Sequence, residues 1–73
     1  MNMDPRHLCY LATVVECGTL HAAASALGLT QPALTRTMQI LEARAGVALF
    51  DRSGRRSRPT PAGLELAALG RSI

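Results

Sequence analysis

A helix-capping residue followed closely by proline occurs three times in this sequence, as Asp4-Pro5, Thr30-Gln31-Pro32 and Thr60-Pro61. The side-chain oxygen of Asp or Thr accepts a hydrogen bond from the first turn of a helix, and proline is tolerated there because its missing N–H would have no partner. Ala and Leu also supply much of the apolar content, whereas β-branched residues are few. The chain is therefore constrained to a mostly helical fold, and its 73 residues suffice for one small domain.

Glycines and one further cap set the other boundaries. Gly18, Gly28 and Gly46 fit the position just after a helix ends, and Thr19 fits the cap of a short second helix. Together with apolar residues at helical spacing, these signals predict helices over residues 5–17, 20–27, 31–45 and from 61 onward. We expect the fourth helix still to be running at Ile73.

The segment between the third and fourth expected helices has the pattern of a short hairpin. Val47 to Phe50 is a β-prone run, and residues 51–56 form a polar, turn-prone stretch. Four arginines fall within seven residues of this segment: Arg52, Arg55, Arg56 and Arg58. A hairpin this basic is suited to lie along phosphates or to enter a minor groove, although a cluster of charges is also commonly just solvated.

Positive charge is concentrated in the second part of the chain. The net charge is +3, and residues 31–73 hold seven Arg against three acidic residues. This asymmetry favours an acidic partner for that part. No apolar run approaches the roughly 18 residues that span a bilayer, and the N-terminus lacks the layout of a signal peptide. We therefore expect a soluble, cytoplasmic protein with no membrane partner.

The cysteines and histidines do not predict a metal site, a cofactor or catalysis. Cys9 and Cys17 would lie about 12 Å apart along a helix, beyond the roughly 7 Å reach of a disulfide, so we expect free thiols. His7 and Cys9 would point about 200° apart and could not share a metal ion. A nucleophilic Cys would need a His base in a concave pocket, which a domain this small does not offer. We expect no metal ion, no cofactor and no enzymatic activity.

The second and third expected helices are joined by the three-residue turn Gly28-Leu29-Thr30. Two helices joined in this way are typical of the helix-turn-helix, which places its second helix in the major groove of DNA. One stripe of that helix is suited to packing, and it consists of Leu34, Met38, Leu41 and Ala45. The residues predicted to contact DNA lie near its start: Thr30, Gln31, Pro32, Thr35, Arg36 and Gln39. Their alternative interpretation is as ordinary solvent-facing residues, with Pro32 serving only to start the helix.

Short motifs throughout the chain carry a resemblance to a known family. They are His7-Leu8, Tyr10-Leu11, Gly18-Thr19-Leu20, Ala23-Ala24, Leu27, Thr30-Gln31-Pro32-Ala33-Leu34-Thr35-Arg36, Leu41-Glu42, Gly46-Val47, Leu49-Phe50-Asp51-Arg52 and Thr60-Pro61-Ala62-Gly63. In these motifs the chain resembles the LysR-type transcriptional regulators, without a gap from about residue 5 to residue 73. The resemblance implies a winged helix-turn-helix over residues 1–60 and the start of a linker helix over residues 61–73. It also implies that a small-molecule effector would act only through a larger domain that these residues do not include.

The sequence departs from the usual family pattern at a few positions. Leu11 and Leu20 stand where Phe is usual, Cys9 where Arg is frequent, and His21 where a small hydroxyl residue often contacts the DNA backbone. Pro59 replaces a Leu before Thr60. Because proline has no N–H and a fixed φ, we expect it to shorten the second strand of the hairpin or to confine it to a sheet edge.

The fourth helix has two apolar stripes, with Leu64, Ala67 and Ala68 on one and Leu66, Leu69, Gly70 and Ile73 on the other. One helix cannot bury both stripes within one small domain. The second stripe either covers the N-terminal helices of its own subunit or, as the resemblance implies, pairs with the same helix of a second copy through Leu66, Leu69 and Ile73. Such a homodimer would present two recognition helices to a quasi-palindromic operator.

These observations predict sequence-specific binding of double-stranded DNA by the DNA-binding domain of a bacterial LysR-type regulator. The third helix would enter the major groove, while Arg52, first among the hairpin arginines by resemblance, Arg55 and Arg56 would lie on the DNA backbone or in a minor groove. The alternative is a small helical interaction or dimerisation module, in which the arginines only confer solubility. The salt dependence of DNA affinity separates the two.

Overall fold

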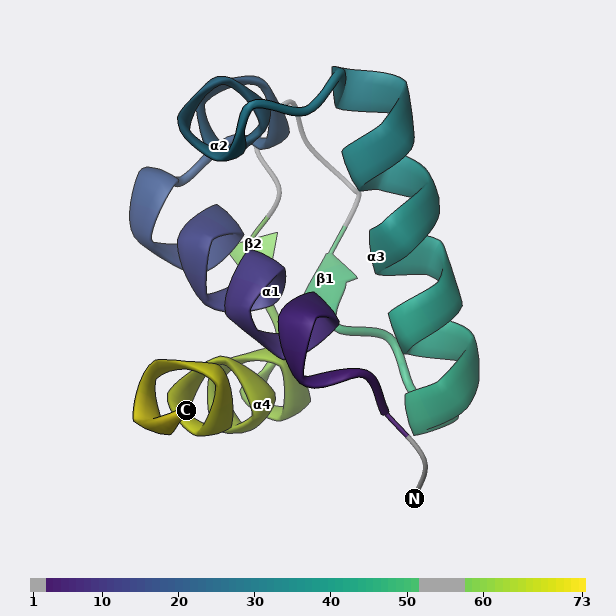
Figure 1. Ribbon diagram of the computed structural model, residues 1–73. Helices are drawn as coiled ribbons and strands as arrows, with labels where there is room; N and C mark the ends of the chain where they lie inside the picture. The colour runs from purple at the N-terminus through teal and green to yellow at the C-terminus, as the bar shows by residue number, and fades with distance from the viewer. Residues whose placement is uncertain (1–2, 52–57) are drawn as a thin grey trace.

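The computed structural model describes residues 3–51 and 58–73, which form four helices and two short strands (Figure 1). The elements follow in the order α1 (Pro5–Cys17), α2 (Leu20–Leu27), α3 (Gln31–Ala45), β1 (Phe50–Asp51), β2 (Arg58–Pro59) and α4 (Pro61–Ser72). The helix spans predicted from caps and glycines are confirmed, and Ile73 is the C-terminal cap of α4. None of these helices combines the length and the hydrophobicity that crossing a membrane requires.

Each helix begins at the cap that the sequence predicts. Asp4 Oδ1 accepts a hydrogen bond from the backbone N–H of Arg6 at 2.9 Å. The hydroxyl oxygens of Thr19, Thr30 and Thr60 accept from the N–H three residues further on, at 3.1, 3.3 and 3.1 Å. These bonds satisfy donors that have no partner within the helix. Local sequence therefore determines where the helices start.

The turn between α2 and α3 depends on Gly28. Its φ of 70° lies in the left-handed region, where a side chain would be disfavoured. The N–H of Gly28 donates to the carbonyl of Ser25 at 3.3 Å, and the N–H of Leu29 donates to the carbonyl of Ala24 at 2.9 Å. The end of α2 is thereby closed, and the chain passes directly to Thr30, the cap of α3. The predicted three-residue turn is confirmed.

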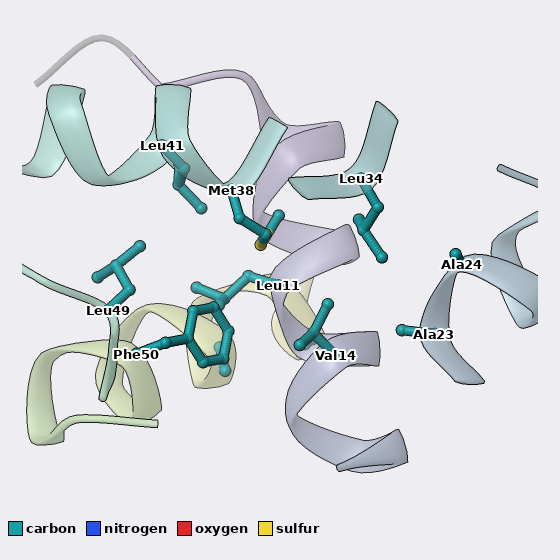
Figure 2. Packing of buried hydrophobic residues seen from close by; sticks show 11 residues of the cluster. Leu11, Val14, Ala23, Ala24, Leu34, Met38, Leu41, Leu49 and Phe50 are labelled. Carbon is teal, nitrogen blue, oxygen red and sulfur yellow. The ribbon is translucent and has the colours of Figure 1, made fainter. Parts of the chain in front are cut away.

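The core lies between α1, α2, α3, α4 and the segment that enters β1 (Figure 2). Its buried members are Leu11, Ala12, Val14, Ala23, Ala24, Leu34, Met38, Leu41, Leu49, Phe50 and Ala67. The predicted apolar stripe of α3 is the packed one, since Leu34, Met38 and Leu41 point from it into the core (Figure 2). Burying each large side chain of this kind contributes about 1.5–3 kcal/mol to stability.

α4 packs most extensively on α1, and two glycines set how closely it approaches the rest of the fold. A Cβ at Gly70 would overlap the carbonyl oxygen of Leu8 in α1. A Cβ at Gly63 would overlap the carbonyl oxygen of Leu49, just before β1. Ala67 lies between the two glycines on the same side and is fully buried. Larger side chains at these positions would push α4 away from the core.

This packing regroups the two apolar stripes that the sequence predicts for α4. The buried Gly70 and the half-buried Leu66 face the core, although the sequence grouped them with Leu69 and Ile73. The apolar residues that α4 leaves exposed are Leu64, Ala68, Leu69 and Ile73. The predicted grouping of these residues was wrong. Helical periodicity gives the angles between side chains around the helix axis, but it does not say which side of the helix faces the core. The contacts of Gly63 and Gly70 decide that.

The two strands, β1 and β2, pair with each other. Phe50 pairs with Pro59 and Asp51 with Arg58, in antiparallel register. Of the β-prone run that starts at Val47, only Phe50 lies in a strand, where it pairs with Pro59. Proline donates no hydrogen bond to a sheet, and Pro59 is the last residue of β2, an edge strand of the two-stranded sheet, so the expected edge position is confirmed.

Candidate nucleic-acid interface

The N-terminal half of α3 presents an exposed side that faces away from the core. In Figure 1, α3 stands at one edge of the fold with α1 and α2 on its inner side. Its inner side is buried through Leu34 and Met38. On its outer side Gln31, Pro32, Arg36 and Gln39 are exposed and Thr35 is half-buried. The residues of α3 that the sequence assigns to DNA contact are therefore together on one surface.

Five of these residues line a single open hollow of about 430 Å³: Gln31, Pro32, Thr35, Arg36 and Gln39. Residues four positions apart on a helix are neighbours, so Gln31, Thr35 and Gln39 form one row and Pro32 and Arg36 form the row beside it. The rows offer amide, hydroxyl and guanidinium groups around one apolar ring. Such a mixture can recognise base edges as well as phosphates.

Thr30 is the sixth predicted contact residue, and the structure gives it a structural role. Its hydroxyl oxygen accepts the capping hydrogen bond from the N–H of Ala33 at 3.3 Å. A hydroxyl can donate and accept at the same time, so its hydrogen is still available to a ligand. Thr30 thus lies at the margin of the exposed surface rather than in the lining of the hollow.

The electrostatic surroundings of the hollow favour an anion. Arg36 is exposed, and the first turn of α3 contains no acidic residue. The aligned peptide dipoles place partial positive charge at this end of the helix. The acidic residue of α3, Glu42, lies near the other end, where its carboxylate accepts hydrogen bonds from the N–H groups of Leu49 and Phe50.

The basic hairpin is described in part. Arg58 lies in β2 and is exposed. Arg52, Arg55 and Arg56 fall outside the described residues, so their predicted contacts with DNA stay a prediction. The hairpin follows α3 in the chain with only residues 46–49 between them.

The thiols and imidazoles do not gather into a site within the described ranges. No three His, Cys, Asp or Glu side chains of residues 3–51 and 58–73 are grouped so that they could hold a metal ion. Cys9 is a half-buried free thiol whose Sγ donates to the carbonyl oxygen of Gly70 at 3.6 Å. Cys17 is an exposed free thiol.

Asp4 and Arg6, at the start of α1, form an ionisable pair whose pKa values are both shifted. The guanidinium and the backbone N–H of Arg6 both donate hydrogen bonds to Asp4. These bonds lower the pKa of the Asp4 carboxyl, and the bond from the guanidinium has the larger effect. The same side-chain bond raises the pKa of Arg6. Because Asp4 caps α1, this pair bears on stability rather than on the hollow of α3.

Comparison with known proteins decides the family. The family model described as "Bacterial regulatory helix-turn-helix protein, lysR family" matches residues 5–64. The chain belongs to the LysR family. The HTH-type transcriptional regulator TcbR of Pseudomonas sp. (strain P51) is 44% identical over 71 residues, which are 97% of this chain and 22% of that relative. This LysR-family chain thus spans about a fifth of the length of the curated relatives it matches, which are transcriptional regulators and not enzymes.

Solved structures of LysR-family proteins share the fold. The DNA-binding domain of CbnR, solved as a DNA complex, matches with a TM-score of 0.88 and 44% identity over 97% of this chain and 82% of that one. The DNA-binding domain of BenM, solved in complex with benA site 1 DNA, matches with a TM-score of 0.88 and 36% identity over 96% of this chain and 79% of that one. The predicted winged helix-turn-helix is confirmed.

The departures of this LysR-family chain from the usual pattern can be placed in the fold. Leu11 is fully buried and Leu20 packs half-buried against the core, so aliphatic side chains fill both positions. Cys9 faces α4 through its contact with Gly70. His21 is exposed in the first turn of α2.

The residues predicted for dimerisation are separated by the packing of α4. Leu66 packs partly against its own core, whereas Leu69 and Ile73 are 55% and 67% exposed. Leu64, which the sequence placed on the other stripe, is 48% exposed. Sequence reasoning also missed the contacts of Glu42 with the segment before β1, because they join residues seven and eight positions apart across an irregular segment and leave no periodic signal.

Proposed function

We propose that this chain binds double-stranded DNA with sequence specificity, as the DNA-binding domain of a bacterial LysR-type transcriptional regulator. In this proposal α3 enters the major groove and the hairpin lies on the backbone or in a minor groove. The observation that carries it is the hollow on α3, where Gln31, Thr35, Arg36 and Gln39 gather beside Pro32 on a fold shared with two DNA-bound domains.

The chemistry of the hollow suits base recognition. A guanidinium such as that of Arg36 makes two hydrogen bonds to the major-groove edge of guanine, and the amides of Gln31 and Gln39 can do the same with adenine. The ring of Pro32 and the methyl group of Thr35 can contact the methyl group of thymine. The hairpin arginines supply contacts with phosphate that position the helix without reading sequence.

The proposal includes a homodimer on a quasi-palindromic operator, with residues 61–73 as the start of the linker helix. The exposed side chains of Leu69 and Ile73 support such an interface, with Leu66 contributing only the part that its own core leaves uncovered. A small-molecule effector would act through a domain outside these 73 residues, and a regulator of this kind would work in the cytoplasm, where bacterial DNA is. The DNA-binding role requires no cofactor.

The deciding experiment starts from a random duplex library, from which binding sites are selected with the 73-residue chain. Affinity for a selected duplex and for a scrambled one is then measured by fluorescence anisotropy from about 50 to 200 mM salt. We expect a preference for the selected duplex and a steep loss of affinity with salt. Replacing Arg52, Arg55 or Arg56 with Ala should reduce the slope of log K against log salt by about 0.9 for each phosphate that the variant no longer neutralises. A chain that selects no sequence and whose weak binding ignores salt would instead be the interaction module.

A further inference from the structure

The segment that joins α3 to the hairpin is held by a carboxylate from α3. Glu42 Oε2 accepts hydrogen bonds from the backbone N–H groups of Leu49 at 2.7 Å and Phe50 at 3.3 Å. One charged oxygen thus takes both donors at the point where the chain enters β1. A hydrogen bond to a charged acceptor is roughly twice as strong as one between neutral groups, and these two are partly buried.

The same segment is held from α4 on its other side. Thr60 donates its N–H to the carbonyl of Leu49 at 3.0 Å and its hydroxyl to the carbonyl of Ala48 at 2.7 Å. The side chains of Leu49 and Phe50 are buried in the core. Thr60 therefore fixes the entry to β1 relative to α4, and among the described residues Glu42 supplies the polar contact that fixes it relative to α3.

We infer that Glu42 is a positioning residue for DNA binding, which holds the entry to β1, where the hairpin begins, at a fixed place relative to the hollow on α3. This inference rests on the proposed function. The two parts of the proposed DNA interface, the hollow on α3 and the hairpin, lie on different elements. Glu42 comes six residues after Arg36, which is roughly 9 Å along the helix. If the hairpin were loosely held, ordering it would oppose binding each time the protein met DNA. By holding the entry to β1, the two hydrogen bonds to Glu42 lower that cost before the encounter.

Whether removal of the carboxylate raises or lowers the affinity for DNA separates this positioning role from ordinary repulsion between a carboxylate and phosphate. A carboxylate on a DNA-binding surface repels phosphate, so removing an acidic side chain should raise affinity. Glu42 should behave in the opposite way, because its loss releases the hairpin. Glu16, exposed near the end of α1, is a matched control for the loss of one negative charge.

The test measures the affinity of Glu42→Ala, Glu42→Gln and Glu16→Ala for a selected duplex. Each variant is made with and without Arg58→Ala. The temperature is one at which circular dichroism shows every variant to be folded. We expect Glu42→Ala to bind about 3- to 10-fold more weakly, which is the range for ordering a few side chains. Glu42→Gln should recover part of that loss, since the amide oxygen can still accept. Glu16→Ala should bind as the parent does or more tightly.

The readout that a merely structural role would not change is the coupling with Arg58. If Glu42 places the hairpin, Arg58→Ala should cost less affinity in the Glu42→Ala background than in the parent. In Glu42→Ala, the DNA should also lose its protection from hydroxyl radicals where the hairpin meets the duplex. The bases selected by α3 should stay the same. An equal cost in both backgrounds, or a uniform loss of protection, would overturn the inference. If Glu42→Ala does not fold, Glu42→Gln decides by its sign, since binding as tight as that of Glu16→Ala overturns the inference. A parent chain that selects no duplex would instead refute the proposed function.

Discussion

Arg36 is the residue on which the reading of DNA sequence depends most. It is exposed, it lines the hollow of α3, and it lies one turn after Pro32 on the outer side of the helix. A guanidinium there can reach a base edge because neighbouring side chains on this surface are short or uncharged. Gln39, one turn beyond Thr35, lines the same hollow and so shares this surface with Arg36.

Replacing Arg36 with Ala should cost about 1–3 kcal/mol of specific binding and relax the preference at one base position, because the variant cannot form the bidentate hydrogen bonds to a base. Selection of binding sites with the variant, followed by anisotropy, measures both effects. Arg71→Ala removes the same charge from the exposed end of α4 and serves as the control. Unchanged affinity and an unchanged selected sequence in Arg36→Ala would show that α3 is not the reading helix.

Asp4 links the stability of α1 to pH. In the fold, the pKa of Asp4 is lowered below its ordinary value of 3.8. The contribution of the ionised carboxylate to the free energy of unfolding is therefore fully present above pH 3.8, and it is lost as the pH falls through the pKa of the folded state. Asn is an equally good cap that does not titrate. We expect the stability advantage of the parent over Asp4→Asn to shrink below pH 3.8 in urea denaturation at a series of pH values. An advantage that stayed constant to lower pH would show that the Arg6 pair does not stabilise the fold.

Among the secondary-structure elements, α4 is placed by its glycines. Gly63 meets the backbone before β1, and Gly70 meets the backbone of α1. Neighbouring backbone cannot move aside as a flexible side chain can, so the position of α4 is defined closely. That position leaves Leu64 exposed on one flank of α4 and Leu69 and Ile73 exposed on the other.

Gly70→Ala should destabilise the fold by about 1–3 kcal/mol, although Ala is the better helix former, because the added methyl group overlaps the carbonyl of Leu8. Thermal and urea denaturation measure the change. Ala68→Gly, on the exposed side of the same helix, should cost about 1 kcal/mol through helix propensity alone. Should Gly70→Ala stabilise the protein, α4 would not pack on α1 as closely as the structure describes.

At the scale of the fold, the proposed function uses the hollow on α3 and the exposed Leu69 and Ile73 at the end of α4. Leu69 and Ile73, four residues apart, are large exposed apolar side chains that a partner could cover together. A second copy of the chain that covered Leu69 and Ile73 would bring two hollows into one assembly.

Leu69→Glu should weaken self-association, because each large side chain that a partner covers contributes roughly 1.5–3 kcal/mol and a carboxylate there would have to be desolvated. Sedimentation velocity over a wide concentration range, with and without a selected duplex, measures the effect. Ala26→Glu on the exposed side of α2 adds the same charge elsewhere as a control. If the parent is a monomer at every concentration and binds one copy per site, with Leu69→Glu behaving identically, the dimer is wrong.

Much of the fold was predictable because its signals are local. The caps at Asp4, Thr30 and Thr60 and the turn at Gly28 act within a few residues, so the helix spans followed directly from the sequence. The hollow on α3 was predictable for a related reason. Once the apolar stripe of a helix is known, the residues opposite to it must face outward.

Local sequence was thus enough to define the four helices, the turn that joins α2 to α3, and the residues that gather on the outer side of α3. The buried side of α4 and the carboxylate that ties the hairpin to α3 emerged only when the elements packed together. Those outcomes depend on contacts between segments that are separate along the chain, such as Gly70 with Leu8 and Glu42 with Leu49. Periodicity fixes angles within one helix, whereas close packing between elements selects the angle that buries most surface without overlap.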